Sequence, residues 1–158
     1  MFKIKINKLR IINYKIFRDE IINLHENCNI FVGDNESGKS TLLEALQIVL
    51  SNKLNSYSFE RQIKASFFNQ STRRKYIESI KSQTLNEYEL PKITIEAYFS
   101  NINAFSAELK GSNNTLCEDC PGISIELSFN DQYSREYKKM LCKGEIDDIP
   151  IEFYSVNW

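Results

Sequence analysis

The chain has 158 residues, of which 42% are hydrophobic and 26% are charged, and its formal net charge is −1. These values are those of an ordinary globular protein, either one domain or part of one, that is long enough to bury a core. No apolar run is long enough for a membrane helix, and the N-terminus does not resemble a signal peptide. We therefore expect a cytoplasmic protein without a membrane partner, whose four cysteines are thiols.

Apolar patterns predict three strands at the start of the chain. Residues 3–12 alternate loosely and predict a first strand, which extends at most to Phe17. Residues 20–24 predict a second strand that ends at the polar turn 25–27, and the apolar run 28–32 predicts a third, buried strand. Two short strands this close together favour an antiparallel meander ahead of residue 33.

Residues 33–40 fit the phosphate-binding pattern G-x-x-x-x-G-K-[ST], known as the P-loop. A helix is predicted to follow, because positions 42, 43, 46, 49 and 50 are apolar and have the spacing of a helix face. Backbone N–H groups from about Asn35 to Ser40 would surround the phosphates, and two glycines permit the tight bend. The predicted nucleotide-binding residues are Gly33, Asp34, Asn35, Glu36, Ser37, Gly38, Lys39, Ser40 and Thr41.

The side chains of this loop have separate expected roles, with ATP and Mg²⁺ as the expected cofactors. Lys39 should reach the β- and γ-phosphates, and the hydroxyl of Ser40 should ligate Mg²⁺. Thr41 is placed either to bond the α-phosphate or to cap the helix. The carboxylate of Glu36 would have to point away from the phosphates, because it would otherwise repel them. A GTPase is rejected, because the partial D-x-x-G and N-K-x-D matches at 119–122 and 52–55 are in the wrong order.

Residues 51–90 have the composition of a basic, helical insertion. Within them, residues 51–81 carry seven basic and two acidic side chains. Helices are predicted from about 59 to 68 and from about 71 to 83. Clustered cations interleaved with aromatic residues suit a nucleic-acid backbone, although the solvated face of ordinary helices has the same composition. The candidate DNA contacts are Arg61, Lys64, Arg73, Arg74 and Lys75.

The remaining residues predict further strands and one weak metal signal. Strands are expected at 92–99, 123–129 and 151–156, a loop at 111–122, and a helix at 131–142. Cys117 and Cys120 form a C-x-x-C pair and are candidate zinc ligands, but a second pair would be needed, and only Cys142 or Cys28 is available. The alternative is a surface loop with reduced thiols. His25, the single histidine, has no evident nucleophile partner.

The stretch 33–46, Gly-Asp-Asn-Glu-Ser-Gly-Lys-Ser-Thr-Leu-Leu-Glu-Ala-Leu, resembles the P-loop and first helix of the ABC-type ATPases of the SMC and RecF group. The most similar branch is the OLD (overcoming lysogenization defect) family, many of whose members have a small residue in place of Glu36. Residues 9–17 resemble the group's first strand and its Asn-[Phe/Tyr]-[Arg/Lys] turn. This implies that Lys15 contacts the nucleotide, and a solvated lysine in a strand turn is the alternative.

The resemblance covers residues 3–50 and implies an α/β P-loop NTPase fold. The expected architecture is an ABC-ATPase-like N-terminal lobe, with a mixed or antiparallel sheet around the P-loop helix and a helical insertion. Three parts are expected: residues 1–50 with the P-loop and first helix, the insertion at 51–90, and antiparallel strands and loops at 91–158.

The sequence lacks several elements that hydrolysis in this family requires. We find no Walker B segment, no Ser-Gly-Gly signature and no Toprim-like acidic cluster. We therefore expect the chain to be part of a longer ATPase that forms a homodimer through its ATP site, with a nuclease domain or partner downstream. The implied role is DNA processing, repair or anti-phage defence. The alternatives are a small-molecule P-loop kinase and a non-hydrolysing, ATP-binding regulatory module.

Overall fold

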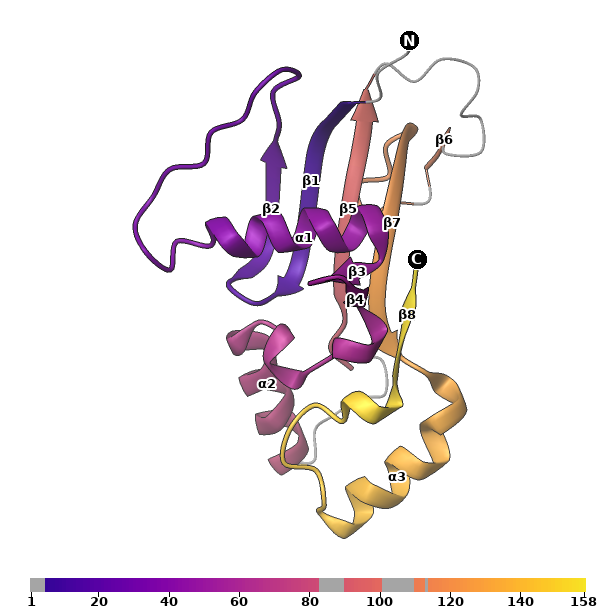
Figure 1. Ribbon diagram of the computed structural model, residues 1–158. Coiled ribbons are helices and arrows are strands. Elements are labelled where there is room, and N and C mark those ends of the chain that lie inside the picture. Colours follow the sequence, from indigo (N-terminus) through magenta and orange to yellow (C-terminus); the bar gives the residue numbers. More distant parts are fainter. Residues whose placement is uncertain (1–4, 83–89, 101–109, 113) are drawn as a thin grey trace.

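The computed structural model describes residues 5–82, 90–100, 110–112 and 114–158. At its centre is a sheet in the order β2-β1-β5-β7-β6, and β8 also pairs with β7 (Figure 1). All pairings of the described strands are antiparallel. The strands are β1 (Lys5–Tyr14), β2 (Phe17–Asn23), β5 (Ile93–Ser100), β6 (Lys110–Gly111), β7 (Cys120–Phe129) and β8 (Tyr154–Asn157).

The core lies between this sheet and helix α1 (Lys39–Ser51), which crosses one face of it (Figure 1). Strand alternation places one set of apolar side chains on that face, and the register sets Leu9 opposite Ala97. The helix buries Leu42, Ala45, Ile48 and Val49. The predicted apolar helix face was therefore partly wrong, because Leu43 and Leu50 at two of its positions are 57% and 45% exposed.

Two further helices lie beyond one end of the sheet (Figure 1). Helix α2 (Gln70–Lys81) confirms the helix predicted at 71–83 over the residues that the structure describes. Helix α3 (Ser134–Lys143) confirms most of the helix predicted at 131–142, although residues 131–133 of the predicted range form a 3₁₀ turn. The hydroxyls of Tyr76 and Tyr137, 3.1 Å apart in the core, join α2 to α3.

The helix predicted at 59–68 was wrong. The chain forms a short hairpin of β3 (Lys53–Leu54) and β4 (Tyr57–Ser58), followed by 3₁₀ turns at 60–62 and 65–67. The phenylalanines in this segment, Phe59, Phe67 and Phe68, are all buried. Irregular backbone allows all three rings to face the core, which a regular helix does not do at this spacing.

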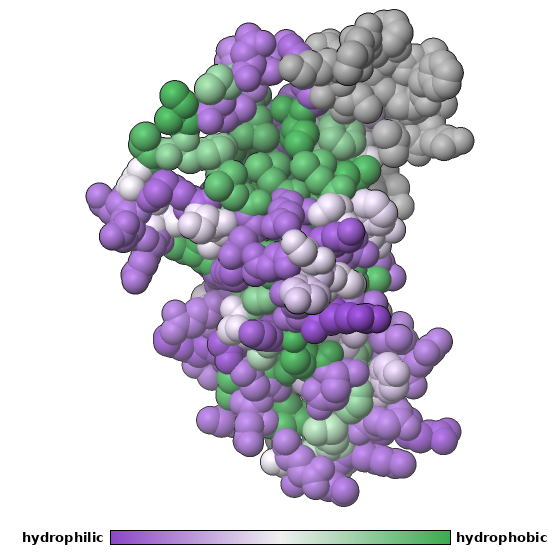
Figure 2. Space-filling model, in the orientation of Figure 1, coloured by the Kyte–Doolittle hydropathy of each residue, from purple (hydrophilic) through white to green (hydrophobic). Residues whose placement is uncertain are grey.

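The buried strand predicted at 28–32 was also wrong. The backbone N–H of Leu24 still donates to the carbonyl of Asn7 at 2.8 Å, and then the chain leaves the sheet. Ile30 and Val32 are 81% and 85% exposed, and no described strand pairs with this segment. Figure 1 shows the β2–α1 connection swinging away from the sheet, and Figure 2 shows apolar surface on the same face of the molecule. The predicted strand at 92–99 is confirmed except for Lys92, which precedes β5, and the predicted strand at 123–129 is confirmed as part of β7.

The sheet also carries a polar network on β1 and β5. The carboxylate of Glu96 is 4% exposed and accepts hydrogen bonds from the hydroxyl of Tyr98 at 2.7 Å and from the N–H of Thr115 at 2.9 Å. Arg10 donates to the carbonyl of Thr115 at 3.0 Å and forms a two-point pair with Asp19. These bonds satisfy the buried carboxylate and fasten the segment before β7 to the sheet. None of the described helices has both the length and the hydrophobicity that a membrane span requires.

Candidate nucleotide-binding site

The P-loop is a tight turn at the N-terminal end of α1, and the structure explains why glycine is needed at two of its positions. Gly38 has φ +92°, in the left-handed region that favours glycine. A Cβ there would lie 3.0 Å from Ile16 and 3.1 Å from Phe17, which belong to the β1–β2 hairpin. A Cβ on Gly33 would lie 2.7 Å from the Ser37 hydroxyl. The loop therefore packs against itself and against the hairpin at distances that exclude a side chain.

The ammonium of Lys39 is held inside this loop. It donates to the carbonyls of Gly33 and Asp34, at 2.6 Å each, and to the hydroxyl of Ser37 at 3.1 Å. The N-terminus of α1 has no side-chain cap. Its first N–H groups and its positive dipole end therefore remain available to an anion. This donor set suits a polyphosphate, so the residues present fit ATP with its Mg²⁺.

One cavity of about 340 Å³ is lined by all of the predicted nucleotide-binding residues except Gly33 and Asp34. One wall is the β1–β2 turn, with Lys15 and Ile16, and the other is the continuous run from Asn35 to Thr41. Figure 1 shows this turn beside the N-terminal end of α1. The structure thus brings Lys15 to the P-loop across a long sequence separation, while Gly33 and Asp34 take part through their carbonyls.

Glu36 is the unusual residue of the loop. It is exposed and has φ +69°, a left-handed conformation that costs a non-glycine residue about 1–2 kcal/mol. Glycine would adopt this conformation without that cost.

Sequence reasoning missed Glu44, which links α1 to the β1–β2 turn. One carboxylate oxygen of Glu44 pairs with the ammonium of Lys15 and accepts a hydrogen bond from the Tyr14 hydroxyl at 3.2 Å. Burial, followed by the nearby Glu44 charge, raises the pKa of Tyr14 well above its usual range. A signal was present in the sequence, since Glu44 lies four residues after Ser40 and so on the same side of the helix.

Of the candidate zinc ligands, Cys120 is the first residue of β7 and Cys117 lies in the segment before it. Cys117 is exposed with φ +54°, and the Cys120 thiol lies 3.5 Å from the carbonyl of Glu118. Burial, together with Glu118, raises the pKa of the Cys120 thiol, which disfavours the thiolate that a metal needs. Within the described part of the chain, no group of three or more His, Cys, Asp or Glu is arranged to hold a metal. The zinc site stays a prediction.

The candidate DNA contacts differ in their surroundings. Arg73 forms a two-point ion pair with Asp148, with Nε at 3.1 Å from one carboxylate oxygen. The interleaved aromatic residues, Phe67, Phe68 and Tyr76, are core residues and so do not stack on bases. The remaining candidates are exposed: Arg61, Lys64, Arg74 and Lys75.

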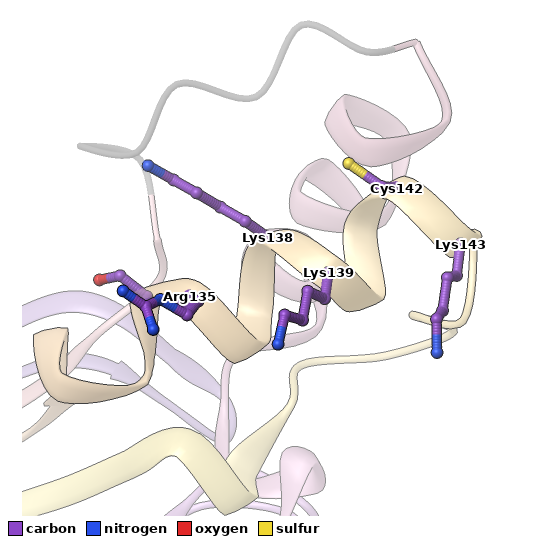
Figure 3. Close-up of a pocket in the computed structure, with 6 residues that line it drawn as sticks. Arg135, Lys138, Lys139, Cys142 and Lys143 are labelled. Carbon is purple, nitrogen blue, oxygen red and sulfur yellow. The ribbon is translucent and has the colours of Figure 1, made fainter.

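A larger, open depression of about 720 Å³ lies along α3, far from the P-loop in sequence. It is lined by Ser134, Arg135, Lys138, Lys139, Cys142 and Lys143. Figure 3 shows that these side chains splay outward along the helix and do not converge on one point. Ligand sites need polar groups that converge, so the P-loop cavity is the better candidate.

A P-loop at the start of a helix, in an α/β domain, is typical of proteins that bind nucleotide phosphates. The family model described as an AAA ATPase domain matches residues 4–153, so the chain belongs to this family. ATP binding and hydrolysis with Mg²⁺ is the general activity of such domains. Among curated proteins, no match to the chain was found.

Proposed function

We propose that this chain binds MgATP at the P-loop cavity and belongs to the OLD and RecF-like branch of the ATPases. The observation that carries the proposal is the cavity itself, in which the P-loop, the uncapped start of α1 and Lys15 face one another. Lys39 exchanges its loop carbonyls for phosphate oxygens, and Ser40 supplies a hydroxyl to Mg²⁺. The branch is supported by the resemblance of residues 9–17 and 33–46.

Replacing Lys39 by Ala tests the site. Losing a charge-assisted hydrogen bond costs about 1.5–3 kcal/mol, or about 10–150-fold in affinity, and we expect at least this loss for a fluorescent ATP analogue. Lys53→Ala is the matched control, because Lys53 is exposed on β3, outside the cavity. Circular dichroism checks that both variants fold. Equal analogue affinity in Lys39→Ala and the unaltered chain would refute the site.

We also propose that ATP binding serves DNA processing, repair or anti-phage defence, through ATP-dependent pairing of two copies. The support is the resemblance, the exposure of loop residues 33–37 and the exposed cations Arg61, Lys64, Arg74 and Lys75. The catalytic carboxylate would come from another segment or chain, because this sequence contains no apolar run that ends in Asp-Glu.

Phosphate release from ATP separates the alternatives when it is measured on this chain together with the segment or chain that supplies the catalytic carboxylate. Release of phosphate from ATP that becomes faster when DNA is added supports the DNA-linked role. Tight binding without release, with and without DNA, points to the regulatory module. Phosphate transfer to nucleotides or small metabolites in a screen points to the kinase.

A further inference from the structure

Beside the site, in contact with Lys15, lies a charged group that has not yet been given a role, the carboxylate of Glu44 on α1. We propose that Glu44 is a positioning residue for Lys15 and that it sets nucleotide affinity through that lysine. The inference rests on the proposed MgATP site, because it assumes that Lys15 faces the bound phosphates.

The backbone of Lys15 is fixed before any nucleotide arrives. Its φ is +49°, its N–H donates to the carbonyl of Phe67 at 2.7 Å, and its own carbonyl accepts from the Asn69 amide at 2.8 Å. One segment, residues 67–69, therefore holds the turn by bonding both the N–H and the carbonyl of Lys15. What these contacts leave undetermined is where the long, flexible side chain points.

Glu44 determines the direction of that side chain. The Lys15 ammonium lies 5.4 Å from the centre of the Phe67 ring and 5.5 Å from that of Tyr14, and it pairs with Glu44. Only about 29% of the lysine side chain and 30% of the glutamate side chain are exposed. An ammonium over aromatic rings has lost part of its hydration, and the carboxylate compensates for this loss.

The position of Glu44 gives this pair a consequence for phosphate. The carboxylate projects from the helix whose first residues form the P-loop, so a free negative charge there would repel the polyphosphate. Paired with Lys15, it presents a neutral unit whose cation faces the cavity. The effect of Glu44 on affinity should therefore reverse in sign when Lys15 is absent.

The test is a double-mutant cycle with Glu44→Gln and Lys15→Met, read as the Kd of a fluorescent ATP analogue. With Lys15 present, Glu44→Gln should weaken binding about threefold to tenfold, because the ammonium loses its anchor. With Lys15→Met, the same change should strengthen binding by a similar factor, because it removes an uncompensated negative charge. A residue that only stabilised the helix would weaken binding in both backgrounds.

Glu60→Gln removes an equal charge from an exposed position outside the cavity and should leave the Kd unchanged. Tyr14→Phe removes only the second hydrogen bond to Glu44, and it should change the Kd less than twofold. Equal effects of Glu44→Gln in both backgrounds, or tighter binding when Lys15 is present, would overturn the proposal. If Lys39→Ala binds the analogue as well as the unaltered chain does, the site itself fails. If Lys39→Ala weakens binding but the effects of Glu44→Gln and Lys15→Met are additive, the MgATP site stands and only the role of Glu44 is refuted.

Discussion

Replacing Gly38 by Ala should damage both the fold and the site, by amounts that the structure allows to be separated. The first term is conformational, because a φ of +92° costs an L-residue about 1–2 kcal/mol. The second is steric, because the new Cβ would lie 3.0 Å from Ile16 and 3.1 Å from Phe17. Ile16 is 54% exposed and yields readily, so this term adds about 1 kcal/mol. We expect a total loss of about 2–3 kcal/mol in the free energy of unfolding.

Gly144→Ala is the matched control. Gly144 follows α3 with φ +67°, and a Cβ there would have nothing within 4 Å. Gly144→Ala therefore has the conformational cost without the steric one, and it should lower the free energy of unfolding by about 1–2 kcal/mol. The difference between the two variants in urea unfolding measures the contact between the P-loop and the β1–β2 hairpin.

The same pair of variants tests the site. Gly38→Ala should weaken binding of the ATP analogue at least tenfold, because the N–H groups at the start of α1 rotate when the loop relaxes. Gly144→Ala should leave binding unchanged, since α3 lies outside the cavity. Equal unfolding free energies for the two variants, together with retained binding in Gly38→Ala, would refute the reasoning.

Two other predictions concern charge and exposure. Partial burial raises the pKa of Asp148, but hydrogen bonds from Arg73 and a backbone N–H outweigh it, so the net shift is downward. A carboxyl group whose pKa is lower in the folded protein stabilises the fold at any pH above its pKa in the unfolded chain, which is near 4. This stabilisation is lost as the pH falls through the pKa of the folded protein. Asp148→Asn should thus cost up to about 1 kcal/mol in urea unfolding at pH 7, and clearly less at pH 3; an equal cost at both would contradict this. Because Ile30 and Val32 are over 80% exposed, changing either to Asn should alter the unfolding free energy by less than about 0.5 kcal/mol. Ile48→Ala, in the core, should cost about 2–5 kcal/mol; a similar loss at Ile30 would mean that its segment is packed in solution.

Sequence patterns correctly predicted those elements whose residues alone carry the signal for their structure. The alternation at 92–99 and 123–129 identified two central strands, since each places apolar residues on one face of the sheet. The P-loop pattern located the turn at Gly38 and the start of α1, because glycine and the helix N-terminus are both visible in sequence.

The wrong predictions needed information from elsewhere in the chain. An apolar run such as 28–32 has strand propensity, but nothing in it tells whether a partner strand is in reach. α1 has apolar side chains over more than one face, so the spacing alone could not distinguish Leu42, which is buried, from Leu43, which is exposed. Glu44 is a different case: its place on the Ser40 side of the helix was visible in the sequence, but its partners, Tyr14 at the end of β1 and Lys15 after it, were not.

Both cations of the cavity already have partners in this structure, and this shapes how the site can work. Lys39 has three loop oxygens, and Lys15 has Glu44 and two aromatic rings. A phosphate must replace neutral acceptors at Lys39, a favourable exchange because charge-assisted bonds are about twice as strong. At Lys15 it meets a cation whose carboxylate partner remains in place, so the gain there is smaller. Affinity therefore depends chiefly on Lys39, and the Lys15–Glu44 pair adjusts it.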